Sequence, residues 1–218
     1  MSEVGQGVRV RPWTPAEAWA KLARGNDRFV AGDHWHPNQD AARRDSLTAG
    51  QTPIAVFFGC ADSRVAAEII FDRGLGDLFV VRTAGHVIDQ TVLGSIEFGV
   101  TILDIPLVVI LGHDSCGAVA AAVDAVETGV LPAGHIRDIV ERVTPSVLAA
   151  HRGGKTTADE IEVEHVRHTL HLLTERSNLV VDRIASGRLA VVGAVYNLGD
   201  GRARIVDSVG LDLTSQPT

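Results

Sequence analysis

The sequence predicts an α/β protein with a central, mostly parallel β-sheet. About four parallel strands and one antiparallel edge strand are flanked by helices and preceded by an N-terminal helical arm. Short, continuous apolar segments alternate with segments of helical periodicity, which is typical of a parallel sheet that helices cover on both faces. The last two apolar segments are instead separated by Asp200-Gly201, a dipeptide that indicates a tight hairpin. The final strand is therefore expected to be antiparallel.

The composition is that of an ordinary globular protein with a sizeable core. The 218 residues are 45% hydrophobic and 22% charged, and the net charge of −7 gives no indication of binding to nucleic acid or to an anionic membrane. The polar start lacks the apolar core of a signal peptide, and no apolar run reaches the roughly 18 residues of a membrane span. We therefore expect a cytoplasmic protein, in which two cysteines indicate a free thiol or a metal site more often than a disulfide.

The first predicted helix begins after Thr14 and ends near Gly32. Thr14 is a good N-cap, proline follows at the first helical position, and Glu17 completes a capping box. Residues 1–13 are expected to form a loose arm before this helix. A short helix over 41–49 fits the polar segment that follows it.

The alternating segments give the remaining elements. The predicted strands cover 54–59, 78–82, 107–111, 189–195 and, antiparallel, 204–209. The predicted helices cover 65–71, 91–103, about 118–127 and two or three pieces of 130–187, with breaks at Pro132, Pro145 and Gly153-Gly154. The tail after Gly210 is polar and is expected to be disordered.

Chemically active side chains follow the first and third predicted strands. Cys60, Asp62 and Arg64 come directly after the first strand, and His113 and Cys116 follow the third. Because the carboxyl ends of parallel strands meet at one edge of a sheet, both groups are expected at the same edge. Two thiolates and an imidazole suit zinc, and three protein ligands leave a fourth position open, as in catalytic zinc sites.

A zinc ion at this edge would lower the pKa of bound water from about 15.7 towards 7, which creates hydroxide near neutral pH. Two thiolates donate more charge than two imidazoles and would weaken this effect. Asp62 can accept a proton from the water or occupy the fourth zinc position itself. Arg64 offers the Asp62 carboxylate a bidentate partner, and the zinc stays open while that pair holds.

The alternative without a metal is that the two cysteines are simply small, buried apolar residues. Cys60 alone would favour that interpretation, and an isolated His-x-x-Cys pattern is only moderate support for a metal. The two motifs, however, follow consecutive β-α units, and this pairing favours the metal site.

These motifs resemble those of a known family. Cys60-x-Asp62-Ser63-Arg64 and His113-x-x-Cys116-Gly117 are similar to the two signature motifs of the β-class carbonic anhydrases. The resemblance covers nearly the whole chain and implies one domain over 1–218, with 211–218 as a polar tail. It implies reversible, zinc-dependent hydration of carbon dioxide, with one Zn²⁺ per chain bound by Cys60, His113 and Cys116, and Asp62 with Arg64 as a catalytic dyad.

The resemblance also implies a substrate pocket. Gln51 and the backbone N–H of Gly117 would bind the substrate oxygens, and an apolar wall, partly contributed across a dimer interface, would consist of Phe79, Ala84 and Phe98. A homodimer, often assembled further into tetramers, is the implied state. Thr83 and His86 depart from the family's common Arg-Asn-x-Ala-Asn run, which leaves the local shape of the pocket open.

Two other functions stay open at this point. Relatives with this type of site hydrolyse carbon disulfide or carbonyl sulfide. A non-catalytic zinc or thiol regulator would be marked by a zinc that Asp62 closes permanently, or by reversible oxidation of Cys60 with Cys116. The residues do not distinguish a dimer from a tetramer, and they do not identify a proton shuttle.

Overall fold

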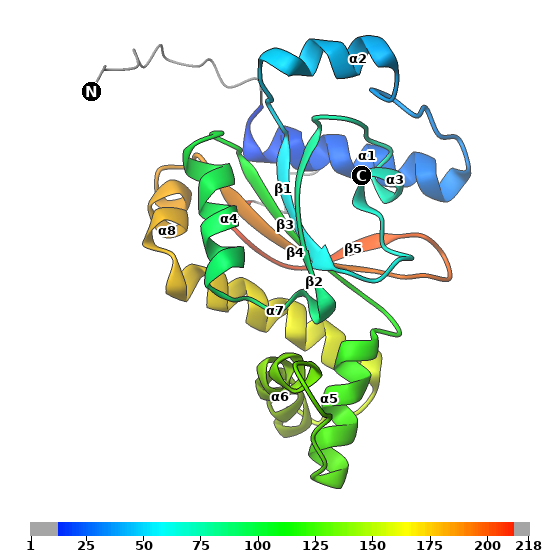
Figure 1. Cartoon of the computed structure of the whole chain (residues 1–218), viewed down its shortest axis with the longest axis vertical. Helices are drawn as coiled ribbons and strands as arrows, with labels where there is room; N and C mark the ends of the chain where they lie inside the picture. Colours follow the sequence, from blue (N-terminus) through cyan, green and yellow to red (C-terminus); the bar gives the residue numbers. More distant parts are fainter. Residues whose placement is uncertain (1–12, 212–218) are drawn as a thin grey trace.

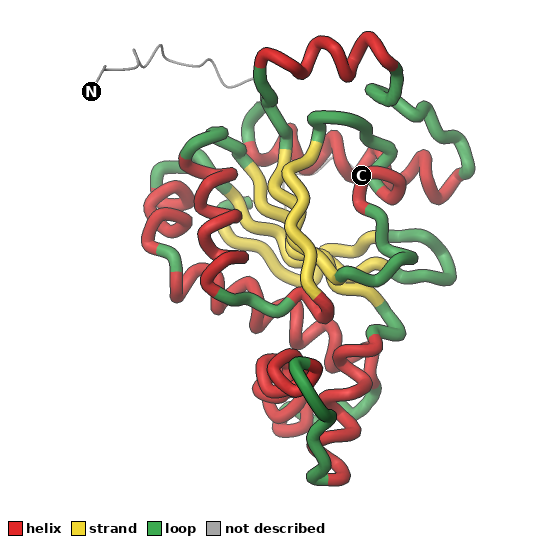
Figure 2. The backbone as a smooth tube through the Cα atoms, in the orientation of Figure 1, coloured by secondary structure: helices red, strands yellow, loops and turns green. Residues whose placement is uncertain are grey.

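The computed structural model describes residues 13–211, and its centre is a five-stranded sheet (Figures 1 and 2). The strand order is β2-β1-β3-β4-β5, and every neighbouring pair is parallel except β4 with β5. The strands are β1 (Ala55–Cys60), β2 (Leu78–Thr83), β3 (Leu107–His113), β4 (Ala190–Tyr196) and β5 (Ala203–Val209). The predicted fold class is thus confirmed, including the antiparallel edge strand.

Helices cover both faces of the sheet and its carboxyl edge. The α-helices are α1 (Pro15–Ala31), α2 (Ala41–Ser46), α3 (Ala67–Ile70), α4 (Gln90–Thr101), α5 (Gly117–Thr128), α6 (Ile136–Arg152), α7 (Ala158–Arg176) and α8 (Asn178–Ala185). Two short 3₁₀ turns, η1 (Leu47–Ala49) and η2 (Ala84–His86), complete the described elements.

The continuous apolar strands are buried because each face of the sheet has its own core. Phe57 of β1 packs with residues of α1 and α3 on one face, and Phe58 packs with residues of α4, α7 and α8 on the other. Successive strand side chains point to opposite faces, so a strand buried on both faces must be apolar throughout. A third cluster joins α5 and α6 to the carboxyl edge of the sheet and contains Cys60 and Cys116.

The N-terminal helix is built as its sequence predicts. The Thr14 hydroxyl accepts a hydrogen bond from the Glu17 N–H at 3.2 Å, and the Glu17 carboxylate accepts one from the Thr14 N–H at 2.8 Å. Gly32 ends the helix in the left-handed conformation, with φ of 71°. The predicted arm lies outside the described residues except for Trp13, whose ring lies 4.3 Å from Lys21 Nζ. The predicted tail likewise lies outside them, apart from Leu211.

Two local predictions were wrong. Pro145 does not break the chain but lies inside α6. Its ring is exposed, while Val143 and Val147 on the opposite face are fully buried. Their burial offsets the roughly 3 kcal/mol that an interior proline costs a helix.

The β4–β5 connection is also looser than the predicted tight turn, because it spans six residues between Tyr196 and Ala203. The Asn197 side chain organises it by accepting hydrogen bonds from the N–H groups of Gly199 and Asp200.

Among residues 13–211, no helix has the length and apolar character needed to cross a membrane.

Candidate metal centre

Two adjacent parallel strands deliver the predicted metal ligands to one edge of the sheet. Cys60 is the last residue of β1, His113 is the last residue of β3, and Cys116 is the N-cap of α5. The register aligns Gly59 with Leu111, so both strands end side by side. The ligand atoms of Cys60, His113 and Cys116 all lie within 4.8 Å of one another, and all three residues are buried.

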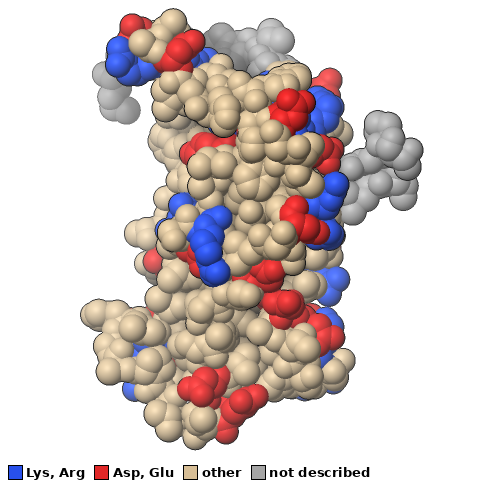
Figure 3. Space-filling view, turned by 90° about the vertical axis from the view of Figure 1, so that its right-hand side faces the viewer, with Lys and Arg blue, Asp and Glu red and all other residues tan. Residues whose placement is uncertain are grey.

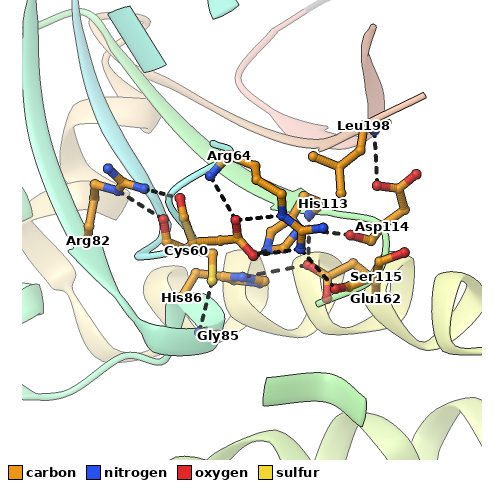
Figure 4. Close-up of polar contacts among 11 residues, drawn as sticks. Cys60, Arg64, Arg82, Gly85, His86, His113, Asp114, Ser115, Glu162 and Leu198 are labelled. Carbon is orange, nitrogen blue, oxygen red and sulfur yellow. Dashed lines mark hydrogen bonds and ion pairs between the residues drawn. The ribbon is translucent and has the colours of Figure 1, made fainter. Parts of the chain in front are cut away.

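The His113 ring presents one nitrogen to this cluster. Its Nδ1 lies 2.8 Å from the backbone carbonyl oxygen of Asp114, which can only accept a hydrogen bond. Nδ1 therefore carries the proton, and Nε2 carries the lone pair. Nε2 is buried and has no hydrogen-bond partner among the described residues. A buried, unpaired imidazole nitrogen in a cluster with two thiols fits a metal ion, and the Asp114 carbonyl on the other side of the ring fixes its orientation. Figure 4 shows His113 beside Cys60.

The two sulfurs differ in their surroundings. A hydrogen bond with the Cys116 thiol lowers the pKa of Cys60 to about 4, and the Gly85 N–H, 3.3 Å from Cys60 Sγ, adds to this effect. The hydrogen bond to Cys60, together with burial, raises the pKa of Cys116. Cys60 is thus the first of the pair to become a thiolate. Two thiolates and an imidazole form a donor set that zinc prefers.

Asp62 and Arg64 form a bidentate ion pair at the mouth of the cluster. Arg64 Nε lies 3.0 Å from Asp62 Oδ1, and Nη2 lies 2.8 Å from Oδ2. The hydrogen bonds from Arg64 hold the pKa of Asp62 well below its usual range. Asp62 Oδ2 also lies 3.9 Å from His113 Nε2. The carboxylate therefore stands between the guanidinium and the ligand cluster, within reach of both.

Arg82, at the end of the neighbouring strand β2, fixes the loop that carries this pair. Its guanidinium donates to the backbone carbonyls of Cys60, at 2.9 Å, and of Asp62, at 2.6 Å (Figure 4). The Ala61 N–H donates to the Thr83 carbonyl and extends the β1–β2 pairing by one residue. The loop therefore leaves the strand end with a defined geometry.

A buried carboxyl group supports the cluster from behind. Glu162 of α7 is 1% exposed, and its Oε1 accepts a hydrogen bond from the His113 backbone N–H at 3.1 Å. Burial raises the pKa of Glu162 to about 8. A Cβ atom at Gly112 would lie 2.2 Å from Glu162 Oε1, so only glycine lets the carboxyl group approach the strand. Sequence reasoning missed Glu162 because nothing in its helical neighbourhood distinguishes it from a solvent-facing glutamate.

Comparison with known proteins agrees with this geometry. The sequence profile of the carbonic anhydrase family matches residues 55–203. Carbonic anhydrase 2 of Mycobacterium tuberculosis is 60% identical over 196 residues, which cover 90% of this chain and 95% of the relative. The chain belongs to the β-carbonic anhydrase family. It is accordingly an enzyme of the carbonic anhydrase class.

Solved structures give the same fold. The β-carbonic anhydrase CafA of Aspergillus fumigatus is 28% identical, with a TM-score of 0.67, and the alignment covers 90% of this chain and 92% of that one. A β-carbonic anhydrase of Sordaria macrospora, described as tetrameric, has a TM-score of 0.67 at 23% identity and covers 86% of this chain and 91% of its own. At that identity the likeness concerns the fold alone.

The chain brings together only part of the predicted substrate pocket. Gly117 begins α5 directly after Cys116, and Ala84 precedes the glycine that contacts Cys60. Gln51 is exposed and precedes the opposite, amino end of β1. Phe79 aligns with Val56, four residues before Cys60 in β1, and its ring stacks on Phe98 at 6.1 Å. Within one chain, Gln51, Phe79 and Phe98 therefore lie away from the ligand cluster.

Proposed function

We propose that this protein hydrates carbon dioxide reversibly to bicarbonate and a proton, with one Zn²⁺ per chain bound by Cys60, His113 and Cys116. The observation that carries the proposal is the buried, unpaired Nε2 of His113, together with the clustering of one ligand atom each from His113, Cys60 and Cys116 within 4.8 Å of one another. Family membership supports the same reaction. When bound, zinc supplies the Lewis acidity that makes water a nucleophile near neutral pH.

The Asp62–Arg64 ion pair at the mouth of the cluster has two proposed roles. Asp62 accepts a proton from water, and Arg64 keeps the fourth metal position open. Asp62 is ionised throughout the neutral range, so its carboxylate can accept a proton from water near His113 Nε2. Arg64 holds both carboxylate oxygens and thereby keeps Asp62 from occupying the metal's fourth position. Loss of this pair would let Asp62 close the site.

Substrate binding needs few polar contacts because carbon dioxide is uncharged. The first N–H groups of a helix have no acceptor within that helix, which makes the Gly117 N–H a donor for a substrate oxygen. The Gln51 amide is the second proposed donor. Phe79, Ala84 and Phe98 are proposed to form the apolar wall that excludes excess water.

We further propose that a second copy of the chain completes this pocket, because Gln51, Phe79 and Phe98 lie away from the ligands of their own chain. Phe98 is 46% exposed and Val80 of the edge strand β2 is 37% exposed, so apolar surface is available for a partner. Figure 3 views another side of the molecule, turned away from α4, where most groups are uncharged and many of the acidic and basic groups lie along one edge. The proposed state is a homodimer, and pairing of dimers into a tetramer is a possible outcome of its test. A cytoplasmic location stays a prediction.

A subunit-mixing experiment tests the shared pocket. Chains with Gln51→Ala and chains with Cys60→Ser are each expected to be inactive, but a mixed dimer would pair the intact Cys60 of one with the intact Gln51 of the other. Co-refolding equal amounts should restore about one quarter of wild-type activity, because half of the dimers are mixed and each contains one complete site. No recovery in a mixture shown to contain mixed dimers would contradict a pocket shared between subunits.

The reaction itself is tested by measuring carbon dioxide hydration on protein loaded with one zinc per chain, at roughly pH 8–9, above the expected pKa of the bound water. Carbon disulfide and carbonyl sulfide are assayed in parallel. Preference for a sulfur compound would assign the site to hydrolysis of that compound. Stoichiometric zinc without turnover of any of the three substrates would indicate a regulator and overturn the proposal.

A further inference from the structure

One glycine connects the metal ligand Cys60 to the interior of the protein. The Gly85 N–H donates to Cys60 Sγ at 3.3 Å, and the Gly85 carbonyl accepts a hydrogen bond from His165 Nε2 at 2.8 Å. Gly85 has the left-handed conformation, with φ of 64° and ψ of 23°. Holding its carbonyl therefore restricts the backbone that aims its N–H at the sulfur.

The imidazole that holds this carbonyl is locked at both nitrogens. His165 of α7 is 2% exposed, and its Nδ1 lies 2.9 Å from the Ser146 hydroxyl of α6. The Gly85 carbonyl can only accept, so Nε2 carries the proton and Nδ1 accepts from Ser146. Burial lowers the pKa of His165 to about 4, which keeps the ring neutral and this tautomer fixed near neutral pH.

The next residue, His86, reinforces the arrangement. Its ring is completely buried, with its centroid 4.3 Å from that of His165 and 6.3 Å from that of Phe58. Its φ of 38° is unusual for a residue other than glycine and costs about 1–2 kcal/mol. Packing of the ring offsets this cost and holds two consecutive left-handed residues beneath Cys60.

We propose that His165 is a positioning residue for the metal centre, which acts through Gly85 to keep a backbone N–H on the sulfur of Cys60. The inference rests on the proposed role of Cys60 as a zinc ligand. A hydrogen bond to the thiolate draws electron density from the sulfur, and a fixed donor prevents the sulfur from turning away from the ion. His165 therefore influences both the affinity for the metal and the strength of the sulfur–metal bond, although it touches neither atom.

Two substitutions at position 165 separate the hydrogen bond from the volume of the ring. His165→Gln places an amide N–H near the position of Nε2, whereas His165→Leu fills similar space without a donor. We expect His165→Leu to weaken zinc binding by about 10–100-fold, the usual effect of losing an outer partner of a metal ligand, and His165→Gln to stay within about threefold of wild type. Competition with a zinc chelator measures these affinities.

A spectroscopic readout reports on the sulfur itself. In Co²⁺-substituted protein, the sulfur-to-cobalt charge-transfer band is expected to shift in His165→Leu and to stay in place in His165→Gln. The matched control is His168→Leu, one turn further along α7 and only half-buried, which should change neither the affinity nor the band. A merely structural role for His165 would lower thermal stability without moving the band.

Wild-type affinity and an unshifted band in His165→Leu would overturn the inference. If that variant does not fold, Ser146→Ala, which removes only the partner of Nδ1, should weaken zinc binding in the same direction by a smaller factor, and an unchanged affinity there would overturn it equally. The outcome is independent of the proposed reaction. A wild-type protein that binds zinc but does not hydrate carbon dioxide would end the proposed function, while the affinities of the variants would still decide the role of His165.

Discussion

Two polar clusters lie on opposite sides of the same three ligands, and they are built on opposite principles. The front cluster consists of Asp62 and Arg64, which are ionised, and the Arg64 side chain is 52% exposed. The rear cluster consists of His86, Glu162 and His165, which are at most 2% exposed. Burial disfavours the charged form of each of these residues. A solvated ion pair exchanges partners at little cost, whereas a buried polar group is costly to leave unpaired. The front cluster is therefore suited to change during turnover, and the rear cluster to remain fixed.

The largest expected effect comes from removing the atom that both clusters surround. Cys60→Ser should abolish stoichiometric zinc binding and carbon dioxide hydration together, because it replaces the ligand atom and the acceptor for the Gly85 N–H. Metal analysis of the purified protein and a hydration assay measure the two losses. Full retention of zinc in this variant would contradict the ligand assignment and remove the basis for comparing the two clusters.

Next in size is the effect of breaking the front pair. Arg64→Gln should retain zinc but lower kcat by about 10²–10⁴-fold, because Asp62 loses its bidentate partner and becomes free to bind the metal. Arg137→Gln, which breaks the exposed pair with Glu141 on α6, is the control and should leave kcat unchanged. A kcat within twofold of wild type in Arg64→Gln would show that the ion pair does not gate the site.

The front and rear clusters also differ in how far the sequence predicts them. Cys60, Asp62 and Arg64 lie within five residues, and parallel strands bring His113 and Cys116 to the same edge, so the ligand geometry follows from strand order. The chain thus forms the cluster that its two motifs predict. The catalytic roles of these residues remain predictions, as do those of the pocket residues, which depend on contacts with a second chain.

The rear cluster, in contrast, could not be predicted. Glu162 and His165 are distant from the motifs in sequence. Polar residues at these spacings on a helix predict a face that is exposed to solvent. Their burial depends on where α5 and α6 pack against α7, which no local pattern determines. The interior position of Pro145 has the same origin, because tertiary packing of α6 overrides a local preference for a break.

Substitution of Gly85, whose carbonyl accepts the hydrogen bond from His165, tests the rigidity of the rear cluster. An alanine Cβ at Gly85 would lie 2.6 Å from the Ala118 Cβ and would also be strained by the positive φ. Gly187→Ala is the matched control, because Gly187 has a φ of 68° but nothing within 4 Å of an added Cβ. We expect Gly187→Ala to cost about 1 kcal/mol of unfolding free energy, whereas Gly85→Ala costs more and also weakens zinc binding. Equal losses of unfolding free energy in Gly85→Ala and Gly187→Ala, with unchanged zinc affinity, would show that the backbone at Gly85 can move without disturbing the metal centre.

The smallest expected effect is a pH dependence of stability that arises from the rear cluster. The pKa of His165 is about 4 in the folded chain and 6.5 when unperturbed, so the unfolded chain binds more protons between these values. Stability from the neutral ring is therefore fully present above pH 6.5 and is lost as the pH falls towards 4, with a loss of about 2 kcal/mol near pH 5. His165→Gln has no ring to titrate, so the difference in its unfolding free energy from wild type should narrow by this amount between about pH 7.5 and pH 5. Urea unfolding at both pH values measures the change, and a constant difference would mean that folding does not lower the pKa of the ring, contrary to its buried position between Ser146 and Gly85.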